Sequence, residues 1–188
     1  MQKLAPIALF VYNRPEHTRR TLQFLKQNEL AADSRLFIFS DGPKNAKQAE
    51  KVAEVRALIK QVEGFKSVEI IERSSNLGLA NSVISGVSQL MEEYGQAIVF
   101  EDDLITSPYT LRYFNDALVR YQNEVQVMHI GAYMYPLPIA ESEQLPETFF
   151  FRAATSWGWA TWARAWQHFN PDVEVLMKQF DADQKHQF

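Results

Sequence analysis

Three adjacent acidic residues, Glu101, Asp102 and Asp103, directly follow the apolar run 97–100. Neighbouring like charges repel, so such a group needs either water or a cation around it. Hard divalent cations such as Mg²⁺ and Mn²⁺ take oxygen ligands and fill their remaining positions with water or substrate phosphates. The other reading is a solvated acidic turn, or an N-cap for the next helix. Because the acids follow a buried-looking strand, their position favours a divalent-metal site.

Polar turns follow three other apolar runs. Each turn contains residues that could either bind a ligand or serve the local structure. Arg14 suits a phosphate or a nucleobase edge, or is a surface arginine at the start of a helix. Asp41, which precedes Gly42, either faces a ligand or shapes a turn. Asn76 and Gly78 suit a tight turn into a helix N-terminus that could face an anion, or a plain loop cap.

The segment 156–166 holds all four tryptophans of the chain. Gly158 removes a side chain between two indoles, which leaves room for a close approach to the backbone. Flat apolar rings also suit the CH face of a sugar, so Trp157 and Trp159 are candidates for a carbohydrate contact. Three of the tryptophans recur at helical spacing and predict one face of a helix: Trp159, Trp162 and Trp166.

Apolar runs alternate with amphipathic segments along most of the chain. Strands are predicted at 6–12, 35–40, 67–72, 97–100, 127–130 and 149–152. Helices are predicted at 16–28, 46–63, 79–94 and 108–123, followed by the tryptophan-rich helix. This alternation predicts an α/β fold with a mostly parallel sheet flanked by helices, as one domain over 1–188. Since ligands bind at the carboxyl ends of such strands, the polar turns are expected to converge there.

The composition excludes several classes of function. The chain of 188 residues has a formal net charge of −4 and no cysteine. Thiolate nucleophiles, disulfides and cysteine zinc sites are therefore excluded, and the lack of a basic excess argues against nucleic acid as a partner. No run approaches the roughly 20 apolar residues of a membrane helix. These features predict a cytoplasmic protein, or one that is peripheral at the inner face of the membrane. The oligomeric state is not predicted.

Five short motifs in this order resemble those of GT-A-fold glycosyltransferases. The resemblance is greatest to bacterial family-2-type sugar transferases, with a more distant similarity to the N-acetylglucosaminyltransferase I group. It covers nearly the whole chain, and EDDL together with SWGWATW is its specific part. The motifs are Tyr12–Pro15, Ser40–Gly42, Asn76–Leu79, Phe100–Leu104 and Trp157–Trp162.

The resemblance implies a role for each candidate residue. Asp103 would ligate a Mn²⁺ or Mg²⁺ ion on a nucleotide diphosphate, while Glu101 and Asp102 contact the ribose and sugar of the donor. Asn13 and Arg14 would lie in the nucleotide pocket, and Asp41 would recognise the base. Asn76 would lie near the donor. Gly158 and Trp159 would form the bottom of the site for the donor sugar and the acceptor.

The implied activity is inverting, metal-dependent transfer of a sugar from a nucleotide-diphosphate sugar to a glycan or lipid-linked acceptor. The general base of this group is an acid well after the Gly-Trp segment. Only 22 residues follow Trp166 here, and their acids lie in no recognisable motif, so the catalytic base is unassigned. We therefore expect a donor-binding domain that lacks the C-terminal acceptor part and exposes Val175, Leu176 and Phe180.

Two alternatives remain open. One is a non-catalytic fragment that binds a nucleotide sugar and transfers nothing. The other is a sugar nucleotidyltransferase, which usually needs a glycine-rich loop with Lys or Arg after the first strand. The corresponding loop here, 13–17, reads NRPEH.

Overall fold

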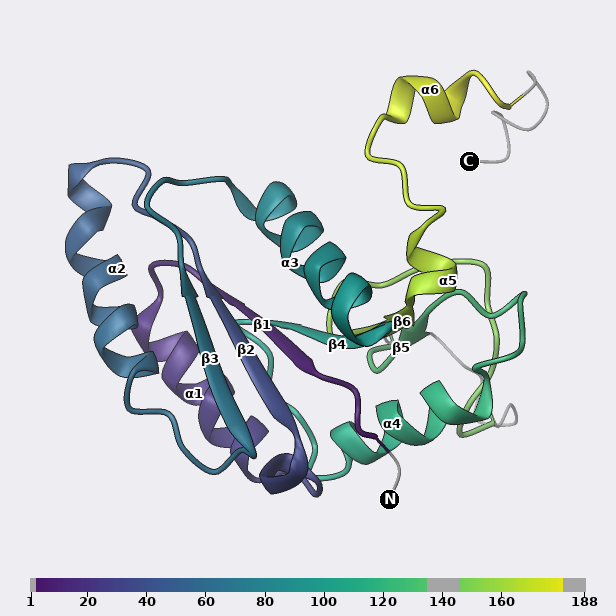
Figure 1. Ribbon diagram of the computed structural model, residues 1–188, viewed down its shortest axis with the longest axis horizontal. Coiled ribbons are helices and arrows are strands. Elements are labelled where there is room, and N and C mark those ends of the chain that lie inside the picture. Colours follow the sequence, from purple (N-terminus) through teal and green to yellow (C-terminus); the bar gives the residue numbers. More distant parts are fainter. Residues whose placement is uncertain (1–2, 135–145, 181–188) are drawn as a thin grey trace, which may run out of the picture.

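In the computed structural model, which describes residues 3–134 and 146–180, six strands form one mixed sheet with helices on both faces (Figure 1). The α/β fold predicted from the sequence is confirmed. The strands are β1 (Ile7–Val11), β2 (Arg35–Ser40), β3 (Ser67–Glu72), β4 (Gln96–Glu101), β5 (Ile130–Gly131) and β6 (Trp159–Trp162). The helices are α1 (Pro15–Lys26), the 3-10 turn η1 (Ala31–Asp33), α2 (Ala46–Ile59), α3 (Leu79–Tyr94), α4 (Thr110–Arg120), α5 (Ala163–Trp166) and α6 (Val173–Met177).

The strand order places the predicted turns at one edge. It is β3-β2-β1-β4-β6-β5, with the first four strands parallel and β6 antiparallel to β4. Since β5 is antiparallel to β6, it runs in the same direction as β4. The carboxyl ends of β1 to β5 therefore share one edge with the start of β6.

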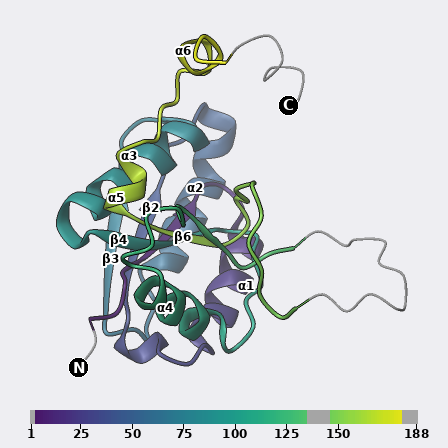
Figure 2. The same cartoon turned by 90° about the vertical axis from the view of Figure 1, so that its right-hand side faces the viewer.

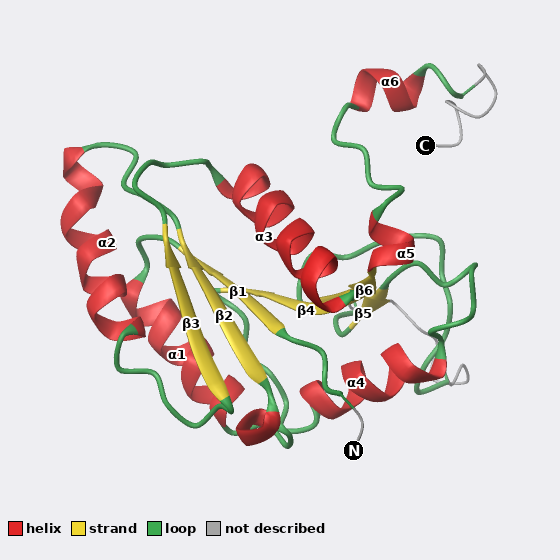
Figure 3. Ribbon diagram, viewed as in Figure 1, coloured by secondary structure: helices red, strands yellow, loops and turns green. Residues whose placement is uncertain are grey.

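Two helical layers account for the apolar strands. All five residues of β1 are buried. Ile7, Leu9 and Val11 pack with α1, α2 and α4, whereas Ala8 and Phe10 pack with α3. Figure 3 shows helices on both faces, and Figure 2 shows α3 and α5 together on the side of the sheet away from α4.

One close approach fixes α3 against the sheet. The rings of Phe10 and Phe39 stack with their centroids 5.0 Å apart. Gly86 of α3 lies over them, and a Cβ atom there would come within 2.8 Å of the Phe10 ring. The glycine therefore lets the helix lie directly on the two rings.

The tryptophan-rich segment corrects one prediction. Trp159 and Trp162 belong to the strand β6, and only Trp166 is helical, in α5. In a strand, residues three apart point to opposite faces, so Trp159 packs on the α3 side and Trp162 on the α4 side. Pairing with β4 decided the outcome, because a short apolar run cannot be assigned to helix or strand by spacing alone.

The predicted strand at 149–152 is also wrong, because none of the described strands pairs with it. Its phenylalanines are exposed instead: Phe149 by 39%, Phe150 by 71% and Phe151 by 49%. The predicted strand 127–130 is reduced to Ile130–Gly131, and two helices are shorter than expected, ending at Ile59 and Arg120.

The last described helix, α6, lies apart from the sheet (Figure 1). Val175 is exposed, as expected, whereas Leu176 and Phe180 are half-buried. Within 3–134 and 146–180 we find no helix with both the length and the apolar character to cross a bilayer.

The first testable prediction concerns the tryptophans. Trp162 is 5% exposed, and its Nε1 donates to the carbonyl of Leu118 at 3.1 Å. We expect Trp162→Ala to lower the free energy of unfolding by about 3–5 kcal/mol, because it leaves a large cavity. Trp166→Ala should cost less, since Trp166 is half-buried. Urea unfolding of both variants measures the difference, and a loss for Trp162→Ala well below this range would contradict the assignment of Trp162 to the core.

Candidate functional site

The acidic cluster meets Arg14 because their strands are neighbours. In the register of β1 with β4, Phe10 lies opposite Glu101, so the loop after β1 lies beside Asp102 and Asp103. Nη1 of Arg14 donates to Oδ2 of Asp103 at 2.9 Å, and Nη2 donates to Oδ1 of Asp102. The guanidinium group therefore bridges the two aspartates, as the predicted convergence requires.

One arginine does not balance three carboxylates. Asp102 is buried, and its Oδ2 atom has no hydrogen-bond partner among the described residues. Burial raises the pKa of Asp102, although Arg14 opposes that shift. Burial also raises the pKa of Glu101, as do the charges of Asp103 and Asp102. The cluster is therefore short of positive charge.

These residues fit a cation that is bound partly by substrate. Within the described residues no group of three or more His, Cys, Asp or Glu side chains could hold a metal ion by itself. Mg²⁺-type ions are often held by only one or two carboxylates together with waters and substrate phosphates. The half-exposed carboxylate of Asp103 meets that requirement. The buried Oδ2 atom of Asp102 beside it has no hydrogen-bond partner among the described residues.

Asp41 and Asn76 also lie together, and their hydrogen bonds are to each other and to the surrounding loop backbone. The buried carboxylate of Asp41 accepts hydrogen bonds from the backbone N–H groups of Gly42, Leu77 and Gly78, and from Nδ2 of Asn76. The Asn76 amide also donates to the carbonyl of Gly42. In this conformation Asp41 holds the loop that leads into α3.

Three residues at this edge escaped the sequence reasoning. The hydroxyl of Tyr12 donates to Gln48 and accepts from the backbone N–H of Lys44, which fastens the end of β1 to the start of α2. Arg56 of α2 donates to the carbonyls of Asp41 and Arg73, and so ties the ends of β2 and β3 together. The motif Tyr12–Pro15 includes Tyr12 but gave it no role, and no local motif marks Gln48 or Arg56. Asn13 lies half-buried between Tyr12 and Arg14.

A pocket of about 600 Å³ adjoins the acidic cluster, between the first turns of α3 and the tryptophans. Glu101 lines it, and Trp159 forms part of its wall. The Trp159 ring stacks on His129 and on Trp166, with centroid distances of 5.4 and 6.0 Å. The pocket therefore combines one carboxylate with a broad aromatic surface.

His129 lies at the pocket, which the sequence did not predict. It lines the same pocket, and burial lowers the pKa of its imidazole. Its Nε2 atom and Oγ1 of Thr155 are both buried, without a hydrogen-bond partner in the described part of the chain. No motif or ligand-like spacing in the sequence marks His129.

Gly158 has a clear packing role. Its φ angle is +72°, and a Cβ atom there would lie 3.3 Å from the ring of Phe100. Its carbonyl accepts from the backbone N–H of Ala132 at 3.0 Å, which joins the start of β6 to the loop after β5. Phe100 thus occupies the space that the missing side chain leaves.

Comparisons with known proteins support the fold. No protein-family model and no curated protein matches the sequence. Residues 1–349 of S. aureus TarS align over 84% of this chain and 47% of that one, with a TM-score of 0.51 and 12% identity. A mannosyltransferase from Pyrobaculum calidifontis, solved with GDP-Man and Mn²⁺, covers 68% of this chain and 35% of its own, with a TM-score of 0.44 and 10% identity.

The chain spans less than half the length of the Pyrobaculum calidifontis mannosyltransferase and of the two TarS structures that it resembles. A 4-diphosphocytidyl-2C-methyl-D-erythritol synthase covers 98% of this chain and 92% of its own, with a TM-score of 0.45 and 14% identity. The likeness to TarS shows a GT-A-like α/β fold, and at such low identities it shows no more. The narrower resemblances to family-2-type transferases and to the N-acetylglucosaminyltransferase I group stay predictions.

The second prediction concerns Asp41. We expect Asp41→Ala to lower the free energy of unfolding by at least about 2 kcal/mol, because it leaves several donors of the 76–78 loop without their acceptor. Urea unfolding measures this loss, with Asp33→Ala, an exposed site on η1, as the matched control. A loss no larger than in the control would show that the loop does not depend on this carboxylate.

The third prediction concerns Glu101. Because the pKa of Glu101 is raised in the folded state, the folded protein binds its proton more tightly than the unfolded chain does. The proton on Glu101 therefore stabilises the folded state. This contribution to the free energy of unfolding is fully present below the unfolded pKa and is lost as pH rises through the folded pKa. Glu101→Gln should therefore stabilise the protein near neutral pH.

That gain should shrink as pH falls towards about 4, where glutamate is protonated in both states. Unfolding by urea at both pH values measures it, with Glu92→Gln on the exposed face of α3 as the control. A gain that does not depend on pH would contradict the electrostatic explanation.

Proposed function

We propose that this chain binds a nucleotide-diphosphate sugar with a divalent cation at the carboxyl edge of the sheet. We further propose that it transfers the sugar to a hydroxyl of a glycan or lipid-linked acceptor. The observation that carries the proposal is the acidic cluster. Arg14 bridges Asp102 and Asp103, yet one buried oxygen of Asp102 has no hydrogen-bond partner among the described residues, and one arginine does not neutralise three carboxylates.

The cation and the diphosphate would each use groups at this edge. Asp103, with its half-exposed carboxylate, would hold Mn²⁺ or Mg²⁺, and Asp102 would complete or orient that contact. The bound cation would neutralise charge on the leaving diphosphate. Arg14 presents a planar fork of donors that suits phosphate oxygens, and Asn13 lies beside it.

The sugar would occupy the pocket next to the cluster. Glu101 offers a carboxylate for its hydroxyls, and Trp159 offers an aromatic face for its CH groups. Asp41 and Asn76 would contribute by shaping the loop before α3, and Gly158 by placing Trp159. We keep the expectation of a cytoplasmic reaction, at the inner face of the membrane where the acceptor is lipid-linked.

The fourth prediction tests donor binding. We expect UDP-, GDP-, CDP- or dTDP-sugars, screened with and without Mn²⁺, to raise the melting temperature for one nucleotide class. At about 100 times the dissociation constant the stabilisation is about 2.7 kcal/mol, or roughly 5–10 °C for a chain of this size. Asp103→Asn should remove the part of the shift that depends on Mn²⁺.

Asp33→Asn is the matched control, because it makes the same change at an exposed site near the amino end of β2. If Asp103→Asn kept the full Mn²⁺-dependent shift in melting temperature, the assignment of Asp103 as a metal ligand would be wrong. Release of nucleoside diphosphate in the presence of acceptor then separates a transferase from a non-catalytic binding module. Release of pyrophosphate from a nucleoside triphosphate and a sugar phosphate would instead indicate a nucleotidyltransferase.

A further inference from the structure

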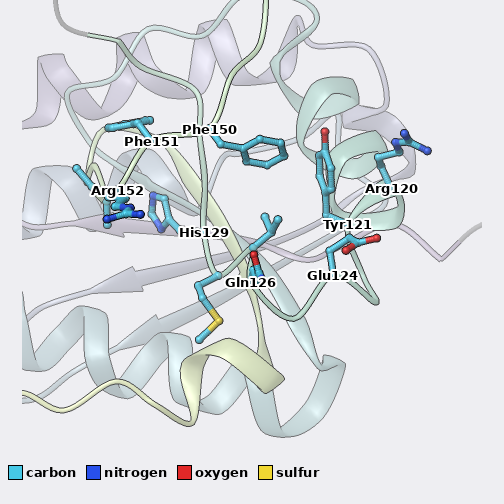
Figure 4. Close-up of a pocket in the computed structure, with 12 residues that line it drawn as sticks. Arg120, Tyr121, Glu124, Gln126, His129, Phe150, Phe151 and Arg152 are labelled. Atoms are coloured by element: carbon cyan, nitrogen blue, oxygen red, sulfur yellow. The ribbon is translucent and has the colours of Figure 1, made fainter.

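A second and larger cavity, of about 900 Å³, lies between the end of α4 and the irregular segment 150–154 (Figure 4). None of the three acidic residues of the sheet edge lines it. It adjoins the pocket beside Glu101, because Met128, His129 and Ala154 line both spaces. These shared residues place the second cavity directly next to the pocket beside Glu101.

The walls of the cavity are aromatic. Tyr121, Phe150 and Phe151 line it, and the rings of Tyr121 and Phe150 meet edge to face with centroids 5.4 Å apart. Phe150 is 71% exposed, which is unusual for an apolar ring that makes a defined contact. Exposed apolar rings gathered around a hollow mark a binding surface, and such faces suit the CH groups of sugars.

The charged side chains that line the cavity form no ion pair within the described part of the chain. Arg120, Arg152 and Glu124 line it, and none of the three forms an ion pair with another described residue. In Figure 4 the two arginines lie at opposite ends of the cavity, with Glu124 on the Arg120 side. The two arginines are therefore too far apart to bind one compact anion together. Glu124 offsets the charge of Arg120, and the positive charge of Arg152 remains.

Arg152 is also the arginine close to the junction of the two spaces. It precedes Ala154 by two residues, and Figure 4 shows it on the same side as His129. A single guanidinium group pairs with one carboxylate through two parallel hydrogen bonds. The cavity thus offers a place for one negative charge near the first pocket, followed by an aromatic surface.

We propose that this cavity is the acceptor subsite for an oligosaccharide that carries a carboxylate sugar. The carboxylate would pair with Arg152, and the next sugars would lie over Phe150 and Tyr121. This assignment rests on the proposed sugar transfer at Glu101, and it places part of the acceptor site within a chain that was expected to lack the acceptor part. An anionic membrane surface fits less well, because the rings line a hollow and the carboxylate of Glu124 lies among them.

The test is direct binding to the full chain. The probes are a tetrasaccharide of alternating glucuronate and N-acetylglucosamine and the same tetrasaccharide with its carboxyl groups reduced to alcohols. We expect the acidic form to bind about tenfold more tightly, the size of one charged hydrogen-bonded pair. Arg152→Gln should abolish that preference, and Phe150→Ala should weaken both forms. Arg20→Gln, an exposed arginine of α1, should leave both unchanged.

Several results would overturn the proposal. These are no binding of either probe, equal binding of both, an unchanged preference in Arg152→Gln, or competition by inorganic phosphate alone. Stronger binding to vesicles of anionic lipid than to the tetrasaccharide would make this face a membrane surface instead. Nucleotide-sugar thermal shifts on the same variants separate this proposal from the previous one, since Arg152→Gln should keep them in full.

Discussion

The parallel pairing of β1 with both β2 and β4 is the constraint on which the rest of the structure depends. Parallel strands need long crossovers, and α1, α2 and α3 supply them while covering both faces of the sheet. Because every crossover returns the chain to the same starting edge, every polar turn after a strand lies at the opposite edge. Arg14, Asp41 and the acidic cluster are neighbours for that reason alone.

The electrostatics of that edge follow from burial. A carboxylate at a solvated turn would need no partner, but Asp102 lies inside the protein, and its Oδ2 atom has no hydrogen-bond partner in the part of the chain that the structure describes. Burial disfavours the charged form of both carboxyl groups, so the pKa values of Asp102 and Glu101 are raised. Such uncompensated charge is expected where a ligand completes the arrangement, and perturbed carboxylates cluster at functional sites.

Aromatic side chains divide between packing and recognition according to the strand pairing. Trp162 is fixed in the core by its contact with α4, while Trp159 turns its ring towards the pocket on the other face. Phe149, Phe150 and Phe151 pair with none of the described strands and remain exposed. The ring of Phe150 lies against Tyr121. The same residue type therefore serves the core in one segment and lines an open cavity in another.

The sequence by itself determined the α/β class, the four parallel strands and the convergence of Arg14 with Glu101, Asp102 and Asp103. These features depend on local periodicity and on the fixed geometry of strand-helix-strand units, which any segment expresses without knowledge of its neighbours. The tertiary structure alone decided that Trp159–Trp162 is a strand, that the phenylalanine run is exposed, that Asp41 holds the loop before α3, and that His129 lines the pocket. Each of these depends on a partner far away in the chain, and short apolar or polar segments take the structure that such a partner allows.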